Sequence, residues 1–329
     1  MPARRNIYAL CYCLLFFAGM AKLQAQIKPQ SSHYAFLRTL NNPAFYGLKD
    51  GISVAANYRY QWTKIEGAPQ TFNLLGDAYF PAAHGGVGLN VSNDRVGAYS
   101  HTYFNAGYNF VLKIKDKFRI GIGVAAGADF AKLDGSKLVT PDGDYSNGTD
   151  HHDDLLSSQV VKSIRPNLAV GIAFSWKYLD VGVSYSNLIN AKDKFKGVAG
   201  ELNSKYGSVL ETIISSKVEV GKNFSISPSV ALNTDFVNLQ TDVSIMAGYK
   251  HYIALGLNVR GYNKNTFEAL SPILKIEPVK NFGIIYSYDV SLNKLNPVNN
   301  GTHEITLNYY VPNSKFYKNP KSINHPRFL

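Results

Sequence analysis

The sequence predicts an all-β chain that folds as a transmembrane antiparallel β-barrel of about 14 strands. Apolar and small residues alternate with a period of two from residue 51 to residue 311, which is typical of strands that turn one face toward lipid. Aromatic residues make up 13% of the 329 residues, and charged residues only 17%. A mean hydropathy of -0.13 excludes a bundle of apolar helices, whereas the strands of a barrel are only half apolar.

The first 25 residues have the pattern of a secretory signal peptide. Arg4 and Arg5 precede an apolar run over residues 7–20, which is too short to cross a bilayer comfortably as a helix. A small-residue site ends at Ala25, and we expect cleavage after it. Both cysteines of the chain lie inside this segment, so the mature protein must be stabilised by something other than disulfides. A closed sheet would suffice.

Fourteen segments carry the strand pattern, each near the ~9–11 residues that cross a membrane at a tilt. They are residues 51–62, 69–80, 84–93, 99–112, 117–131, 163–176, 178–187, 209–221, 223–234, 237–249, 251–262, 265–277, 280–291 and 302–311. In the fifth segment one face is Phe, Ile and Val, and the other is mostly Gly and Ala. Small residues on the second face are expected in a crowded lumen, because a soluble sheet would carry long charged side chains there.

The connections between these segments alternate in length. They are short after even-numbered strands, and the long ones, residues 132–162, 188–208 and 292–301, all follow odd-numbered strands. Outer-membrane barrels have short periplasmic turns and long outer loops. An even strand count then places both ends of the barrel domain, residues 51–311, in the periplasm. We therefore expect a periplasmic N-terminal segment at residues 26–50 and a basic periplasmic tail at residues 312–329.

Candidate catalytic and metal-binding groups are few. The loop over residues 142–154 holds adjacent His151 and His152 among aspartates, but adjacent residues rarely supply the converging ligands of a zinc site. Asn147 stands where a calcium loop needs its turn glycine. The sequence has no GxSxG motif and no cysteine beyond the signal peptide. We predict a non-enzymatic protein with no catalytic residue, no metal and no cofactor.

Three arginines are the candidate lumen residues, because the period of two places them on inward faces. They are Arg59, Arg119 and Arg260. Two arrangements stay open. These side chains either line a channel, or they pair with inward carboxylates and fill a closed lumen. The carboxylates considered for such pairs are Asp129, Asp180 and Asp242.

The C-terminal tail is basic and also contains aromatic side chains. Its docking candidates are Phe316, Tyr317, Arg327 and Phe328. The tail is either a frayed, solvated terminus or a docking segment for a periplasmic protein. Removing the signal peptide lowers the formal net charge from +11 to +8 through the loss of Arg4, Arg5 and Lys22. Because export argues against nucleic acid, this charge favours an anionic membrane surface or an acidic partner.

Several motifs, in order along the chain, resemble one known family. The sequence reads LNNPAFYG at residues 40–47, YRYQW at 58–62 and GAPQTF at 67–72. It continues with GVGLNVSNDRVG at 86–97, YSYD at 286–289 and NGTHEI at 300–305. Together these motifs resemble the PorP/SprF family of outer-membrane proteins of the type IX secretion system. The departures are Phe45, where tyrosine is usual, and the segments at 132–162 and 188–208, which do not match.

The resemblance implies a non-enzymatic role in the outer membrane, and it transfers no catalytic residue. Members support the export or surface attachment of particular proteins, including gliding adhesins with a C-terminal sorting domain of type B. Some members associate with periplasmic parts of the machine. The partners implied are a secreted surface protein, other secretion components and outer-membrane lipid. The alternatives are a porin or small-molecule transporter, which predicts an open lumen, and an outer-membrane enzyme.

Overall fold

The computed structural model describes residues 29–114, 118–146, 148–189, 191–198, 200–205, 207–263 and 266–312. The predicted signal peptide and the tail beyond Pro312 lie outside these residues. The strands are β1 (Gly51–Tyr60), β2 (Gln70–Phe80), β3 (Gly85–Val96), β4 (Tyr99–Ile114), β5 (Phe118–Asp134), β6 (Val160–Trp176), β7 (Leu179–Ser186), β8 (Lys192–Lys196), β9 (Glu201–Lys205), β10 (Val209–Ser216), β11 (Val218–Val220), β12 (Phe224–Thr234), β13 (Leu239–Tyr249), β14 (Ile253–Tyr262), β15 (Thr266–Val279), β16 (Phe282–Ser291) and β17 (Thr302–Pro312). The short 3-10 helices are η1 (Arg38–Leu40), η2 (Pro43–Phe45), η3 (Pro81–Ala83), η4 (Gly135–Lys137) and η5 (Asn296–Val298).

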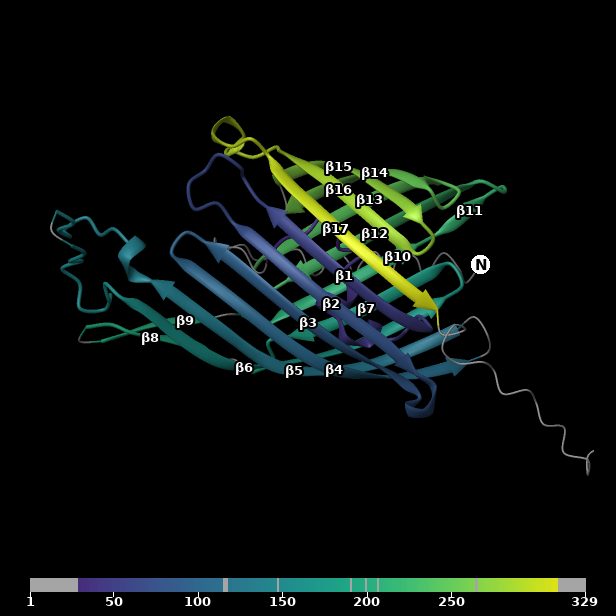
Figure 1. Ribbon diagram of the computed structural model, residues 1–329, viewed down its shortest axis with the longest axis horizontal. Coiled ribbons are helices and arrows are strands. Elements are labelled where there is room, and N and C mark those ends of the chain that lie inside the picture. Colours follow the sequence, from purple (N-terminus) through teal and green to yellow (C-terminus); the bar gives the residue numbers. More distant parts are fainter. Residues whose placement is uncertain are drawn as a thin grey trace, which may run out of the picture.

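The strands form a closed antiparallel barrel (Figure 1). Neighbours along the chain pair from β1 to β7 and from β12 to β17, β10 pairs with both β7 and β12, and β1 pairs with β17 to close the sheet. Strands β10 and β11 both pair with β12, so they count as one barrel strand that is interrupted at Lys217. Counted this way the barrel has 14 strands, which confirms the predicted fold and strand number. The hairpin β8–β9 is a separate two-stranded sheet within the predicted loop at 188–208.

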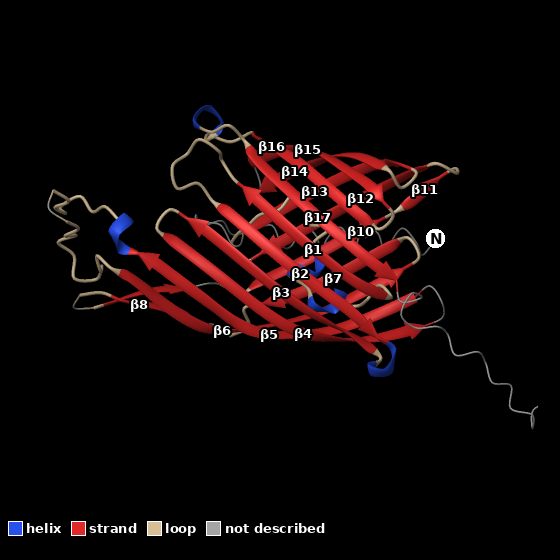
Figure 2. Cartoon of the chain, viewed as in Figure 1, coloured by secondary structure: helices blue, strands red, loops and turns tan. Residues whose placement is uncertain are grey.

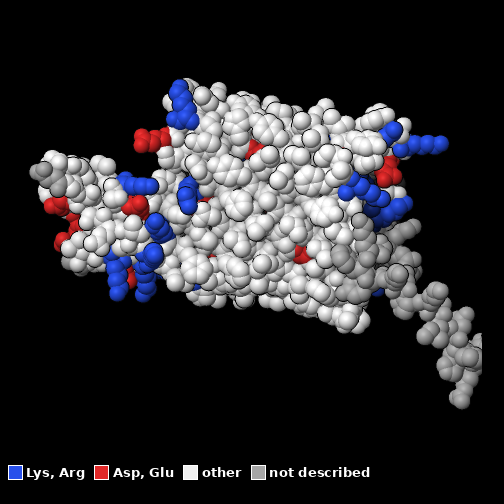
Figure 3. Space-filling view, viewed as in Figure 1, with Lys and Arg blue, Asp and Glu red and all other residues white. Residues whose placement is uncertain are grey.

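Alternation along each strand turns the barrel inside out relative to a soluble sheet. In β13, Val243 and Ile245 are exposed, whereas Asp242 and Ser244, which alternate with them, are buried. Because apolar side chains point outward, the wall between the two ends is nearly free of charge, and Lys, Arg, Asp and Glu gather at the ends (Figure 3). This distribution suits a belt that faces lipid. No helix among the described residues is long and apolar enough to cross a membrane.

The two ends of the barrel differ in the length of their connections (Figure 2). Gly51 and Pro312 pair with each other at the end that carries the short turns. The opposite end carries the long connections between β5 and β6, between β7 and β10, and between β16 and β17. Strands β5 and β6 are each 17 residues long and extend further toward that end than the predicted segments. We call the two ends the short-turn end and the long-loop end.

Residues 29–50, called the plug below, lie inside the barrel and contact the lumen faces of the strands. The expectation for this region was a periplasmic segment. The physical reason for the difference is the width of the barrel, because side chains alone fill a lumen of about 8 strands but not a wider one. A piece of chain supplies the missing volume and binds the inward polar groups.

Candidate functional site: the plugged lumen

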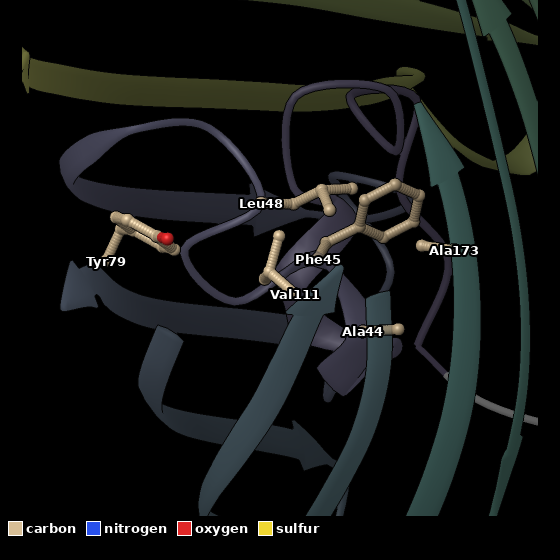
Figure 4. Close-up of a cluster of buried hydrophobic side chains, with 6 residues drawn as sticks. All are labelled: Ala44, Phe45, Leu48, Tyr79, Val111 and Ala173. Carbon is tan, nitrogen blue, oxygen red and sulfur yellow. The ribbon is translucent and has the colours of Figure 1, made fainter. Parts of the chain in front are cut away.

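The half of the plug nearer the short-turn end is a tight turn with the sequence Asn-Pro-Ala-Phe. The Ala44 N–H donates a hydrogen bond of 2.9 Å to Asn42 Oδ1, and Pro43 begins η2. Asparagine is favoured before a helical turn because its side chain accepts a hydrogen bond from a free backbone N–H. Proline is favoured at the first position because its fixed φ suits the turn and no hydrogen bond needs its missing N–H. Phe45 then packs with Leu48 of the plug and with wall residues in a buried apolar cluster (Figure 4). The wall residues are Tyr79, Val111 and Ala173.

Glycines on the lumen face make room for this turn. A Cβ added to Gly121, Gly123, Gly171 or Gly182 would lie 2.5 Å or less from atoms of residues 42–45. These glycines come from β5, β6 and β7, the part of the wall that η2 contacts. Gly121 and Gly123 face the plug backbone, and Gly171 and Gly182 face plug side chains. Close approach of this kind is a recognised use of glycine in strands. The small-residue face predicted as a crowded lumen is therefore the seat of the plug, and we call it the glycine wall.

Two wall asparagines bind the backbone of the plug. Asn109 Nδ2 donates to the carbonyl oxygens of Ala44, at 2.7 Å, and of Tyr46, at 2.9 Å. Asn90 Nδ2 donates to the Thr39 carbonyl oxygen at 2.6 Å and to the Tyr46 hydroxyl at 2.8 Å. These bonds satisfy plug carbonyl groups that have no partner in a sheet.

The half of the plug nearer the long-loop end is held by buried charges. Arg59 Nη2 lies 2.7 Å from Asp289, and its Nη1 lies 2.8 Å from Glu304. Arg260 Nε lies 2.8 Å from Asp242, and its Nη1 lies 3.3 Å from Asp289. All five side chains are at most 3% exposed. Because charges this deeply buried are costly unless they are fully paired, the cluster needs every one of its partners.

Ser32 of the plug completes this cluster. Its backbone N–H donates to Glu304 at 2.8 Å, and its hydroxyl donates to Asp289 at 2.9 Å. Arg260 Nη2 in turn donates to the Ser32 hydroxyl at 3.1 Å. Three carboxylates facing two guanidinium groups leave an excess of acceptors, and the plug supplies donors for them. The docked plug and the charged cluster therefore depend on each other.

The next plug residues extend these contacts. His33 Nδ1 lies 2.8 Å from the Thr306 hydroxyl and 3.7 Å from Glu304. Burial lowers the pKa of His33, although Glu304 and Asp289 oppose the shift, so the imidazole is neutral at neutral pH. The Tyr34 hydroxyl donates to the Ser229 carbonyl oxygen at 3.0 Å. This part of the plug thus spans the lumen from β17 to β12.

The three candidate arginines occupy different parts of the lumen. Arg260 pairs with Asp242, one of the carboxylates considered for it. Arg59 pairs with Asp289 and Glu304, which sequence reasoning did not select.

Arg119 lies near the short-turn end, where it binds Asp50 at 2.7 Å and the Leu48 carbonyl oxygen at 2.7 Å. The other two carboxylates considered, Asp129 and Asp180, pair with Arg165 and Arg38. Two of these pairs could have been found by aligning neighbouring strands of the barrel. Arg59 stands directly opposite Glu304, and Asp242 directly opposite Arg260.

The plug leaves space in the lumen near the short-turn end. A cavity of about 750 Å³ lies there, lined by plug residues and by residues of β1, β2, β5 to β7, β10 and β12 to β17. Ser227, Ser244, Met246 and Lys275 line it, and residues of the short-turn end such as Lys250 border it. The plug therefore packs against the glycine wall and leaves a recess of mixed polarity at the short-turn end of the lumen.

The long-loop end exposes apolar side chains. Val139 is 80% exposed, Val198 is 75% exposed and Phe236 is 61% exposed. Leu155, Leu292 and Val298 in the same set of connections are also exposed. The hairpin β8–β9 is held down by buried Phe195, which packs edge-to-face on Tyr99. These loops therefore present apolar groups on an anchored framework.

The two histidines of the acidic loop contact residues of that loop. The Tyr145 hydroxyl lies 3.2 Å from His151 Nδ1, and His152 Nε2 lies 3.3 Å from Asp150. Within the described residues no group of three or more His, Cys, Asp or Glu side chains is placed to hold a metal ion. The tail candidates Phe316, Tyr317, Arg327 and Phe328 lie outside the described residues.

Solved structures similar to this chain include outer-membrane proteins of low sequence identity. Acinetobacter baumannii Omp33 is 9% identical with a TM-score of 0.45, and the match covers 80% of this chain and 100% of that one. The Ralstonia pickettii toluene transporter TbuX is 12% identical with a TM-score of 0.48, over 89% of this chain and 96% of that one. A Pseudomonas aeruginosa FadL homologue is 11% identical with a TM-score of 0.43, over 86% and 95%. A search of curated proteins gives no match.

The family comparison covers most of the chain. The model of the type IX secretion system membrane protein PorP/SprF matches residues 23–309. This range includes the plug, the glycine wall and the buried charges, as well as nearly all of the barrel. The chain therefore belongs to the PorP/SprF family of type IX secretion system membrane proteins.

Proposed function

We propose that this protein is a non-enzymatic outer-membrane component that docks or anchors a secreted surface protein at its long-loop end. The observation that carries the proposal is the plug. Residues 30–34 are tied to the wall by hydrogen bonds to its buried ion pairs and residues 42–48 by close packing, so the plug fills much of the lumen. A barrel filled in this way acts at its ends.

The long-loop end supplies a surface that suits a protein partner. Exposed Val139, Val198 and Phe236 would each leave water on docking, and burial of apolar area contributes roughly 25 cal/mol per Å². We place this end at the cell surface, because short turns face the periplasm in outer-membrane barrels. The partner class is an adhesin-like protein with a C-terminal sorting domain of type B, as the family implies.

Contacts with periplasmic machinery belong to the short-turn end. The chain leaves the barrel there after Pro312, and the basic tail over residues 312–329 follows. We propose Phe316, Tyr317, Arg327 and Phe328 as the docking residues of this tail. Their aromatic and cationic groups suit an acidic periplasmic protein.

Pull-down of the intact protein from its own membranes tests the proposal. The expected result is co-purification of a secreted surface protein, which is lost in the variant Val139→Ser/Val198→Ser/Phe236→Ser. A matched control replaces exposed apolar residues of the short-turn end, Val220→Ser and Val279→Ser, and should retain the partner. Recovery of neither a secreted protein nor a secretion component would contradict the proposal.

A second candidate function, passage of small molecules, is favoured by the recess of about 750 Å³ beside the plug. It predicts single-channel conductance from the intact protein in planar bilayers. Silence of the intact barrel would remove this candidate and would leave docking as the function.

A further inference from the structure

Three cations stand in one row on the outer wall of the barrel, near the long-loop end. Arg95 is directly opposite Ser100, Ser100 is opposite Lys132, and Lys132 is opposite Lys162, across strands β3 to β6. All three cations are exposed. Their chain neighbours Ala131 and Ser163 are buried on the lumen side, so by alternation the row faces outward.

This row is distinct from the other basic groups of the barrel wall. Among the described strand residues of the barrel, the remaining Lys and Arg face the lumen, and they are Arg59, Lys113, Arg119, Arg165, Arg260 and Lys275. No described carboxylate lies within salt-bridge distance of the three cations of the row. Like charges directly opposite one another, as Lys132 and Lys162 are, destabilise a sheet unless an anion lies between them. Asp134, two residues along β5 from Lys132, is the carboxylate beside the row, and it pairs with Lys137 at 3.9 Å. The three cations of the row therefore exceed the negative charge that the protein places next to them.

The surroundings of the row are ordered by polarity. Asn93 and Thr102 lie on the same outward face, two residues along their strands from Arg95 and Ser100 and nearer the middle of the wall. They share a hydrogen bond of 2.7 Å. Phe130, 45% exposed, and Ile164, 69% exposed, lie at the same level of the wall. A hollow of about 540 Å³ joins these side chains to the row, and Lys137 and Asp134 also line it, so its lining holds four cations and one carboxylate. From the rim inward the wall thus presents cations, then an amide and a hydroxyl, then apolar groups.

We propose that this hollow binds the headgroup of a phosphorylated glycolipid of the outer leaflet, the lipid A part of lipopolysaccharide. Arg95, Lys132 and Lys162 hold the phosphate, because guanidinium and ammonium groups form charge-assisted hydrogen bonds with phosphate oxygens. Asn93 and Thr102 face the sugar, and Phe130 and Ile164 pack against the acyl chains. A lipid fits this order better than an acidic protein, since exposed apolar side chains such as Phe104, Val124 and Ile172 continue along the outer wall.

Direct binding to the full-length protein in detergent tests the assignment. The probes are lipid A, the same lipid without its phosphates, phosphatidylglycerol and inorganic phosphate, each measured by native mass spectrometry. The test variant is Arg95→Gln/Lys132→Gln/Lys162→Gln. The matched control, Lys177→Gln/Lys222→Gln/Lys280→Gln, removes three exposed lysines from the short turns and changes the net charge equally.

Lipid A should bind the test variant about tenfold more weakly or worse, because three charge-assisted contacts are lost. The control variant should bind as the unaltered protein does, and dephosphorylated lipid A should bind both poorly. The heat-dependent gel mobility of folded barrels checks the fold, and Lys132→Gln alone, with a smaller loss, replaces the triple variant if that variant does not fold.

Four results would overturn the proposal. They are equal lipid A binding by the test variant, an equal loss in the control, phosphatidylglycerol or inorganic phosphate binding as well as lipid A, and capture of an acidic protein by the row without lipid A binding.

Discussion

The two halves of the plug are held by different physics. Residues 42–48 are seated by shape, since glycines let the Asn-Pro-Ala-Phe turn approach the wall and asparagines bind its carbonyl groups. Residues 30–34 are held by charge, since Ser32 completes a buried cluster of two arginines and three carboxylates. Packing of this kind depends weakly on pH and salt, whereas a buried ionic cluster fails if one partner is lost. We call residues 42–48 the packed anchor and residues 30–34 the charged anchor.

Removing both anchors has the largest expected effect. A variant that lacks residues 29–48 should conduct ions in planar bilayers at a level far above that of the intact protein, because the lumen loses the chain that fills it. The measurement is single-channel conductance. Equal conductance of the two proteins would show that the plug does not obstruct the lumen in the membrane.

The charged anchor is tested by Glu304→Ala. This change leaves Arg59 with one fewer partner and removes the acceptor of the Ser32 N–H, and breaking a buried pair costs about 3–5 kcal/mol. The measurement is thermal unfolding together with proteolysis of residues 29–50. Glu277→Ala is the control, because its pair with Lys275 is partly exposed and is worth roughly 1 kcal/mol or less. Similar losses in both variants would contradict a special role for the buried cluster.

The packed anchor is tested by Gly123→Ala. The added methyl group meets the backbone of Pro43 and Ala44, and overpacking of this kind costs about 1–3 kcal/mol. Gly76→Ala is the matched control, because a Cβ there has open space around it. We expect proteolysis of the plug to be faster in Gly123→Ala than in the unaltered protein. In Gly76→Ala it should be unchanged. Equal proteolysis of the two variants would contradict the inference that the glycine wall makes room for the plug.

Sequence patterns predicted the wall far better than its contents. Alternation depends on one strand at a time and loop length on one connection at a time, so they predicted the 14 strands of the barrel. The position of residues 29–50 depends on the width of the closed barrel, which no single segment encodes. The partner of Arg59 depends on the register of β1 against β17, where Glu304 stands opposite. Aligning the first and last strands would have found that pair.

The smallest expected effect concerns pH and separates the two anchors most cleanly. Burial lowers the pKa of His33 below its ordinary value of 6.5, with Glu304 and Asp289 opposing the shift and Arg59 adding to it. The released plug then binds a proton more readily than the docked plug does. The contribution of His33 to docking is therefore complete above pH 6.5 and is lost as the pH falls, by up to about 1.4 kcal/mol per pH unit.

Hydrogen exchange of the plug between pH 7.5 and pH 5.5 measures this effect. Protection of residues 30–34 should decrease on acidification while that of residues 42–46 stays constant, because residues 42–46 carry no side chain that changes charge in that window. Gly47 is left out of the comparison, because its N–H donates to the carboxylate of Asp77 at 2.9 Å. His33→Gln removes the titrating group and should flatten the pH dependence of the first segment. If both segments lose protection together, the plug opens as one unit and the division into two anchors is wrong. If His33→Gln keeps the full pH dependence, another group is responsible.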